Sequence, residues 1–224
     1  MTIDLSKEII WIFTEPRSGS TWFSRKLSLI LNRRLHPRDQ GFESKNNKEI
    51  EDFFLSRQQL ETDKEVIFDT HFFSGLKGLK NYSNPIVLRV TRKNKVEQFL
   101  SRVIATKYNH NRVWNVITEQ ERNNLPIIQK TVVSINEVRE YIRLTKRNES
   151  LWNEYSSIYR NETIYYEDLL ENFNSKILPV SNLSMKIEEK GLPLKMPYNK
   201  KDIFINYDQI AKLIKREMPE THQE

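Results

Sequence analysis

Short runs of β-branched and aromatic residues that alternate with helical patterns constrain the fold of this chain most strongly. The runs are Ile9 to Phe13, Glu65 to about His71, and Pro85 to Thr91. Short apolar runs bounded by polar or turn residues are typical of buried strands. Strands that alternate with helices predict an α/β fold, with a parallel sheet of four or five strands covered by helices on both faces.

The pattern of apolar residues also predicts the remaining elements. Ser134 and Glu137 form a capping-box pattern, which marks the start of a helix. Behind it, apolar spacing favours one helix or a helix pair that runs to about Arg160. The other expected elements are helices over Ser20 to about Arg34, Glu49–Leu60, Arg92–Tyr108 and Asp208–Glu217, a turn-rich stretch over Ser74–Pro85, and a strand over Thr163–Tyr166 that passes into a helix.

Composition excludes several classes of protein. The 224 residues include no cysteine, so disulfide scaffolds, thiolate metal sites and cysteine nucleophiles are excluded. Four scattered histidines offer no metal constellation, and we expect no metal. The 36 basic residues are dispersed and balanced by 30 acidic ones, which does not favour a nucleic-acid partner. The net charge of +6 fits an anionic ligand, and by itself it equally fits nucleic acid or no particular partner.

The chain shows neither internal repeats nor a low-complexity linker, so we expect a single domain over residues 1–224. The N-terminal stretch has no signal-peptide pattern, and no window approaches the roughly 18 apolar residues of a membrane span. These features predict a cytoplasmic protein without a membrane partner. Its oligomeric state stays open.

The turn between the first strand and the first helix reads Thr-Glu-Pro-Arg-Ser-Gly-Ser-Thr-Trp, residues 14–22. Such a turn aims backbone N–H groups into one space, where the helix dipole adds about half a positive charge. Gly19 allows a tight turn, the hydroxyls of Ser18, Ser20 and Thr21 can donate, and Arg17 adds a fork of donors. The turn is therefore suited to a phosphate or a sulfate. A capped helix with an exposed arginine is the plainer alternative.

Two better-known phosphate loops do not fit this turn. A Walker A loop requires G-x-x-x-x-G-K-[ST], whereas this turn has one glycine, no Gly-Lys pair, and an arginine before the glycine. The Rossmann G-x-G-x-x-G pattern is also absent from it.

Residues 14–22 resemble the 5′-phosphosulfate loop, T-x-P-[KR]-[ST]-G-[ST]-T-W, of sulfotransferases that use 3′-phosphoadenosine-5′-phosphosulfate (PAPS). Three later stretches resemble the same family in the expected order. Asp69–Phe73 resembles the segment of the catalytic histidine, Leu88–Ser101 the strand-turn-helix that holds the donor's 3′-phosphate, and Tyr165–Asn172 the segment whose tyrosine lies beside the adenine. The resemblance covers about Ile9 to Asn172.

The resemblance implies a P-loop-like three-layer fold and an enzyme that transfers a sulfuryl group from PAPS, without metal, to a hydroxyl or amine. It implies that Arg17 stabilises charge at the phosphosulfate, and that the residues that follow bind the donor. Those donor-binding residues are Ser18, Gly19, Ser20, Thr21 and Trp22. Trp22 and Tyr166 would lie toward the adenine, although both also fit as core aromatics.

The resemblance implies that Arg92 and Ser101 hold the 3′-phosphate. They lie nine residues apart, about two and a half helical turns. Cytosolic sulfotransferases space this pair one residue closer, which makes Lys93 a rival. We prefer Arg92 because bacterial-type members that read R-x-N place the arginine as here. The family's later R-K-G loop is absent, and Lys200 or Lys201 could substitute for it.

His71 is the candidate general base, because an imidazole can accept a proton from an attacking hydroxyl at neutral pH. It lies 54 residues after Arg17 and 21 before Arg92, close to the family's spacing. Asp69 stands where the family has a lysine, so it either orients His71 or marks the match as accidental. His36 and Glu43 compete for the role of base.

The sequence therefore predicts a PAPS-dependent sulfotransferase of bacterial or viral type whose product is 3′-phosphoadenosine-5′-phosphate (PAP). Its acceptor, a small molecule, carbohydrate or lipid, is open. A kinase-like enzyme with the same anion cradle is the rival enzyme, and a basic RNA- or DNA-binding module is the rival outside enzymes. A degenerate relative that binds PAPS or PAP without turnover is a further alternative.

Overall fold

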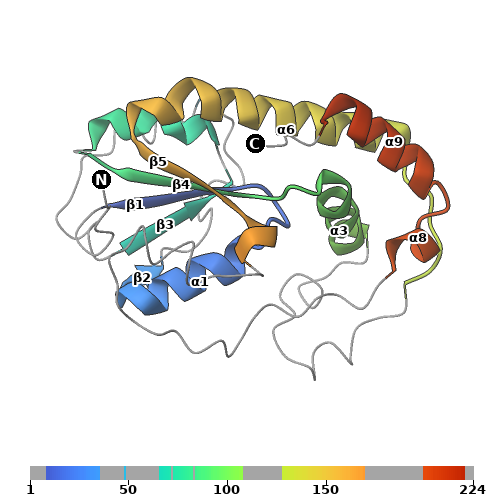
Figure 1. Ribbon diagram of the computed structural model, residues 1–224, viewed down its shortest axis with the longest axis horizontal. Helices are drawn as coiled ribbons and strands as arrows, with labels where there is room; N and C mark the ends of the chain where they lie inside the picture. The colour runs from blue at the N-terminus through green and yellow to red at the C-terminus, as the bar shows by residue number, and fades with distance from the viewer. Residues whose placement is uncertain are drawn as a thin grey trace. The chain divides into compact units, whose positions relative to one another are not determined.

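The fold of the chain is α/β, with one five-stranded sheet. A computed structural model describes residues 9–35, 48, 66–71, 73–82, 84–107, 128–169 and 199–219. The strands are β1 (Ile10–Thr14), β2 (Arg34–Leu35), β3 (Val66–Thr70), β4 (Ile86–Thr91) and β5 (Arg160–Tyr165). They pair in the order β2-β3-β1-β4-β5, all parallel, as predicted (Figure 1).

The described residues form two compact units. The first comprises residues 1–91 and 147–188 and contains the whole sheet. The second comprises residues 92–146 and 189–224. The helical elements are α1 (Ser20–Leu31), the 3₁₀ helices η2 (Phe73–Asn81) and η3 (Ser156–Ile158), and the α-helices α3 (Lys95–Lys107), α6 (Ile135–Tyr155), α8 (Lys200–Ile203) and α9 (Tyr207–Glu217).

Helical segments of the first unit cover both faces of its sheet. Alternate residues of β1 point to opposite faces, since side chains alternate along a strand. Ile10 and Ile12 pack with Phe23 and Leu27 of α1, whereas Trp11 and Phe13 pack on the side of η2 and the last turns of α6. Figure 1 shows α1 and η2 on opposite sides of the strands. All five residues of β1 are buried, which is expected for the central strand of a covered parallel sheet.

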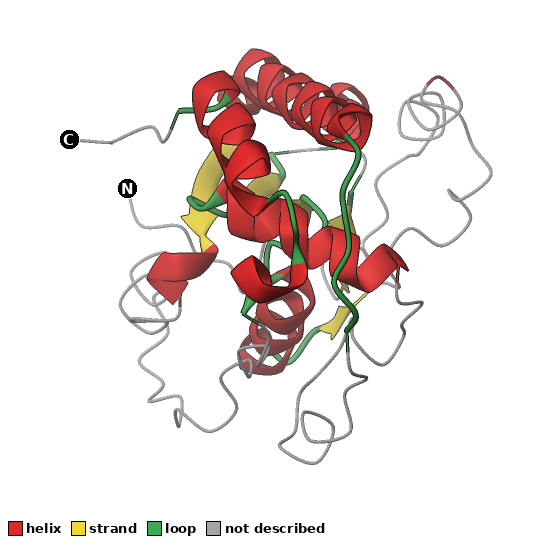
Figure 2. Ribbon diagram, turned by 90° about the vertical axis from the view of Figure 1, so that its right-hand side faces the viewer, coloured by secondary structure: helices red, strands yellow, loops and turns green. Residues whose placement is uncertain are grey.

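The second unit contains α3, residues 135–146 of α6, α8 and α9, joined by loops, over its described residues. Figure 2 draws the helices of the whole chain in red and its loops in green. The apolar core of the second unit joins these four helical segments. Phe99 of α3 packs against Tyr141 of α6 with ring centroids 4.9 Å apart. The Asn206 side chain holds both the N–H and the C=O of Val133, at 3.1 and 2.8 Å, which fixes the stretch before α6.

The capping box at the start of α6 is confirmed. The Glu137 N–H donates to the Ser134 hydroxyl at 3.1 Å, and the Ser134 N–H donates to the Glu137 carboxylate at 3.0 Å. α6 is a single helix of 21 residues, so the alternative of a helix pair is wrong. The predicted tail helix is also confirmed, as α9.

Three local predictions differ from the structure. The stretch from Ser74, predicted as turns, is mostly the 3₁₀ helix η2, which buries Phe73, Leu76 and Leu79 at a spacing of three residues. The last strand begins at Arg160 and ends at Tyr165, so Tyr166 begins a helical segment instead of ending the strand. The two-residue strand β2 was not predicted at all. The helix expected over residues 49–60 lies outside the described residues.

Candidate functional site

The loop from Glu15 to Gly19 lies at the carboxyl end of β1, the central strand. From β1 the chain passes through α1 to β2 on one side, whereas from β4 it reaches β5 on the other. Open parallel sheets bind ligands where successive connections diverge in this way, outside the carboxyl ends of the strands. The turn singled out in the sequence therefore occupies the usual binding edge of such a sheet.

The backbone of this loop is unusual. Arg17 and Gly19 have positive φ angles of 66° and 82°. The left-handed region costs an arginine about 1–2 kcal/mol, whereas glycine enters it freely. The Ser18 N–H donates to the Glu15 carbonyl at 3.2 Å, which closes the turn. The N-cap residue of α1 is Gly19, which has no side chain that could cap the helix. The first turn of α1 holds no acidic residue. The start of this 12-residue helix therefore keeps its positive dipole uncompensated by its own first turn.

Ser18 is the clearest sign of a ligand in the loop. Its side chain is fully buried, and its Oγ has no hydrogen-bond partner within the described part of the chain. A buried hydroxyl without a partner costs about 1–3 kcal/mol. An anion held in the loop would accept this proton and remove that cost.

Tyr166 lies against the loop although it is 147 residues away from Gly19 in the sequence. A Cβ atom added to Gly19 would be 2.1 Å from Cδ2 of the Tyr166 ring. The glycine therefore serves two purposes, the left-handed backbone and the close approach of the ring. The structure brings together two of the predicted donor-binding residues, Gly19 and Tyr166.

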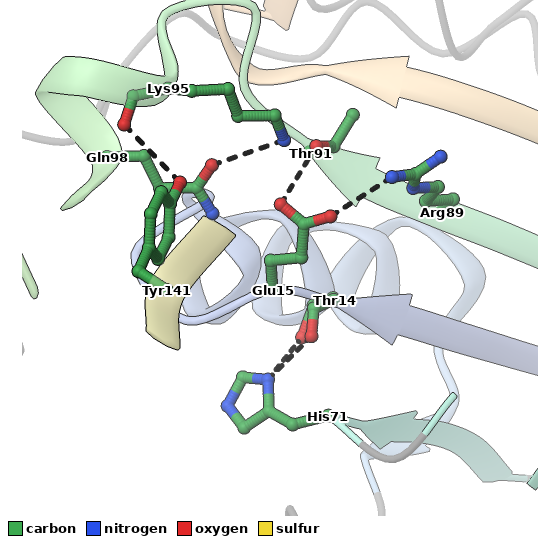
Figure 3. A network of polar contacts seen from close by, with 8 residues as sticks. All are labelled: Thr14, Glu15, His71, Arg89, Thr91, Lys95, Gln98 and Tyr141. Atoms are coloured by element: carbon green, nitrogen blue, oxygen red, sulfur yellow. Dashed lines mark hydrogen bonds and ion pairs between the residues drawn. The ribbon is translucent and has the colours of Figure 1, made fainter. Parts of the chain in front are cut away.

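The buried carboxylate of Glu15 connects the loop to β4, and this contact was not predicted from the sequence. Glu15 is 3% exposed, accepts from Arg89 of β4 at 3.0 Å, and accepts from the Thr91 hydroxyl at 3.2 Å (Figure 3). The Arg89 guanidinium carbon lies 5.8 Å and 6.0 Å from the ring centroids of Phe73 and Trp152. The sequence did contain a signal of this ion pair. Arg89 lies inside a strand that was predicted to be buried, and a buried cation requires a partner.

His71 follows β3 directly and lies beside the end of β1. Its Nδ1 is 2.8 Å from the Thr14 carbonyl oxygen and 3.0 Å from the Thr14 hydroxyl (Figure 3). Asp69, the departure from the family pattern, is buried and accepts from Ser24 of α1 at 2.6 Å and from Thr14 at 3.4 Å. The candidate base and the loop are therefore linked through Thr14.

The structure also places the remaining predicted residues of the stretch 14–22. Arg17 and Thr21 are partly buried, and Ser20 is the first residue of α1. Trp22 is partly buried and packs against the apolar cluster on the α1 side of the sheet, which fits its alternative role as a core aromatic.

The predicted 3′-phosphate residues belong to the second unit. Arg92 follows β4 directly and is partly buried, Lys93 is exposed, and Ser101 is 7% exposed within α3. The Lys200 ammonium forms an ion pair with Glu97 of α3, and the Lys201 ammonium lies 5.5 Å from the centre of the Tyr207 ring. Figure 3 also shows Tyr141 donating to the Lys95 carbonyl at the start of α3.

His36 and Glu43, the competing bases, lie outside the described residues, as do His110 and His222. Among the residues that the structure describes, no group of three or more histidine, aspartate or glutamate side chains could hold a metal ion. No described helix is long and apolar enough to cross a membrane. The chain matches no protein-family model, and no curated protein sequence is significantly similar to it.

Proposed function

We propose that this chain is a sulfotransferase with a P-loop-like fold that takes a sulfuryl group from PAPS and transfers it to a hydroxyl, or less readily an amine, of an acceptor. The observation that carries the proposal is the buried Ser18 hydroxyl, which has no partner among the described residues, in a left-handed loop at the start of α1. The order of the four stretches that resemble PAPS-dependent enzymes supports the choice of anion.

The loop suits the 5′ end of such a donor. Backbone N–H groups at the start of α1 and the Ser18 hydroxyl would bind its non-bridging oxygens. Arg17 would stabilise the charge that grows on the bridging oxygen, by hydrogen bonding and electrostatics, because a guanidinium stays protonated in proteins and does not supply protons. Tyr166, which packs on Gly19, would lie toward the adenine.

The 3′-phosphate would be held by Arg92 and Ser101. This assignment rests on the resemblance and on the position of Arg92 directly after the carboxyl end of β4. Lys93 remains the rival, since it is one residue further along the same turn. The pairing of Lys200 with Glu97 makes Lys200 a weaker substitute for the missing R-K-G loop.

His71 would accept the proton of the attacking hydroxyl. Sulfuryl transfer resembles phosphoryl transfer, in which the protein mainly positions the reactants and stabilises charge around an in-line displacement. The acceptor oxygen forms a bond to sulfur while the bond from sulfur to the bridging oxygen breaks, and the electron pair stays with the departing PAP. No metal takes part in this scheme.

Calorimetric titration with PAP, AMP and ATP-Mg²⁺ tests the proposal. We expect PAP to bind with micromolar affinity and AMP at least about tenfold more weakly, which corresponds to roughly 1.4 kcal/mol. Arg92→Ala should remove the preference for PAP, whereas Arg139→Ala, an exposed arginine of the same unit, should not change it. A preference for ATP-Mg²⁺ would instead favour the kinase-like alternative, and equal binding of PAP and AMP would contradict the proposal.

Turnover separates an active enzyme from a degenerate one. Once PAP binding is established, the release of PAP from PAPS is measured with pooled hydroxyl acceptors. His71→Asn should lose this release and keep its affinity for PAP. Wild-type protein that binds PAP but releases none from PAPS under any acceptor would favour the degenerate alternative.

A further inference from the structure

The register of the parallel sheet places His71 beside Thr14. Phe13 of β1 is paired with Thr70 of β3, so the next residues along the two strands are Thr14 and His71. Both oxygen atoms of Thr14 lie within hydrogen-bond distance of His71 Nδ1, the carbonyl at 2.8 Å and the hydroxyl at 3.0 Å (Figure 3). One ring nitrogen therefore faces two oxygens of one residue.

A carbonyl oxygen can only accept a hydrogen bond, so a contact of 2.8 Å requires the proton on Nδ1. A neutral imidazole carries one N–H, and its other nitrogen then holds the lone pair. We infer that Thr14 holds neutral His71 in its Nδ1–H tautomer and so makes Nε2 the atom that accepts a proton. Free histidine favours the opposite tautomer, in which Nε2 is already protonated and cannot act as a base.

Asp69 helps to orient the Thr14 hydroxyl, together with the Thr70 carbonyl. The hydroxyl has one proton, and its described acceptors are the Asp69 carboxylate at 3.4 Å and the Thr70 carbonyl at 3.5 Å. Ser24 of α1 donates to the other oxygen of Asp69 at 2.6 Å and anchors the carboxylate. When the hydroxyl proton points toward Asp69 or Thr70, its lone pairs face the Nδ1–H of His71. Asp69 is thus a positioning residue that acts on His71 through Thr14.

The catalytic meaning of this arrangement rests on the proposed function. The acceptor's O–H proton moves to Nε2 as the acceptor oxygen bonds to sulfur and PAP departs with the electron pair of the broken bond. The imidazolium that forms keeps its Nδ1–H on the Thr14 carbonyl, so the ring needs no rotation. The tautomer itself does not depend on any ligand.

Histidine-selective ¹⁵N labelling of the full chain tests the inference. There are four histidines, and His71→Gln identifies the signals of His71 by their loss. Two-bond ¹H–¹⁵N spectra at about pH 8.5, where an ordinary imidazole is neutral, distinguish protonated from unprotonated ring nitrogens. We expect the Nδ1–H form of His71 to exceed the Nε2–H form by about tenfold, the effect of a hydrogen bond or two.

Variants test the roles of the Thr14 hydroxyl and of Asp69. Thr14→Val removes the hydroxyl and should lower the ratio several-fold, while Thr14→Ser should keep it. Asp69→Leu should shift the ratio in the same direction as Thr14→Val, and Thr163→Val, in β5 of the same sheet, should leave it unchanged. A wild-type spectrum with the proton on Nε2 would overturn the inference. A Thr14→Val ratio equal to that of the control would overturn the role assigned to the Thr14 hydroxyl and to Asp69, because valine keeps the carbonyl. Failure of PAP to bind while the Nδ1–H signal is present would refute only the proposed function.

Discussion

Gly19 has to be a glycine for two independent reasons. Its φ of 82° strains any residue with a side chain, and a Cβ atom would overlap the Tyr166 ring at 2.1 Å. Gly19→Ala should therefore lower the free energy of unfolding by about 1–3 kcal/mol, measured by urea titration. The double variant Gly19→Ala/Tyr166→Ala should recover the part that is due to the overlap. A single variant as stable as the wild type would show that the loop does not have this conformation.

The ion pair of Glu15 and Arg89 is buried, so the loss of one partner leaves an uncompensated charge. The two side chains are 3% and 7% exposed. Arg89→Met should destabilise the protein by about 3–5 kcal/mol, and the double variant Glu15→Gln/Arg89→Met should recover much of that loss. Glu140→Gln breaks an exposed ion pair with Arg143 and serves as the control, with little expected change in the denaturation midpoint. Equal effects for the buried and exposed pairs would contradict this account.

At the scale of single elements, the capping box fixes where α6 begins. Ser134→Ala removes the acceptor of the Glu137 N–H and should cost about 1 kcal/mol of stability. Ser150→Ala is the matched control, because Ser150 is an exposed interior residue of the same helix and alanine has the higher helix propensity. The control should be neutral or slightly stabilising. The cap has no role if both variants unfold at the same denaturant concentration.

Tyr159 joins the stretch before β5 to η2, since its hydroxyl donates to the Leu76 carbonyl at 2.7 Å. Burial raises the pKa of Tyr159 to about 12. An unfolded tyrosine ionises near pH 10, so unfolding releases a proton between about pH 10 and 12. The free energy of unfolding should therefore be unaffected by this group below pH 10 and should fall as the pH rises from there to 12. Tyr159→Phe should show a shallower fall, and identical slopes would argue against a half-buried, neutral Tyr159.

Strands that are apolar almost throughout could be predicted, whereas the first half of β5 and the 3₁₀ helix η2 were missed. β1 and β4 are buried on both faces and are apolar almost throughout, so their sequence reveals them. The first half of β5 is polar, with Arg160 half-buried and Asn161 and Glu162 exposed, so it carries no alternating apolar pattern. In η2, the two glycines favoured a turn, yet the spacing of Phe73, Leu76 and Leu79 by three residues was the signal of a 3₁₀ helix.

At the scale of the whole molecule, the sequence predicts the parallel sheet and the position of the loop at its binding edge. It does not predict which side chains meet there. The contacts of Glu15 with Arg89 and of Thr14 with His71 arise from strands that are adjacent in the sheet but 50 or more residues apart in the chain. The sequence left open whether Asp69 orients His71 or marks an accidental match, and its hydrogen bonds from Ser24 and Thr14 became apparent only in three dimensions.

The most direct test of the central claim is to map where PAP binds by following the backbone amide signals of the ¹⁵N-labelled chain during a titration. We expect the amide signals of residues 17–21, at the start of α1, to shift first and most, because these amides would bind the 5′-phosphate. Ser18→Ala should weaken this response, whereas Arg25→Ala, an exposed residue of α1, should leave it unchanged. Shifts confined to other parts of the chain, or no shifts at millimolar PAP, would contradict the account.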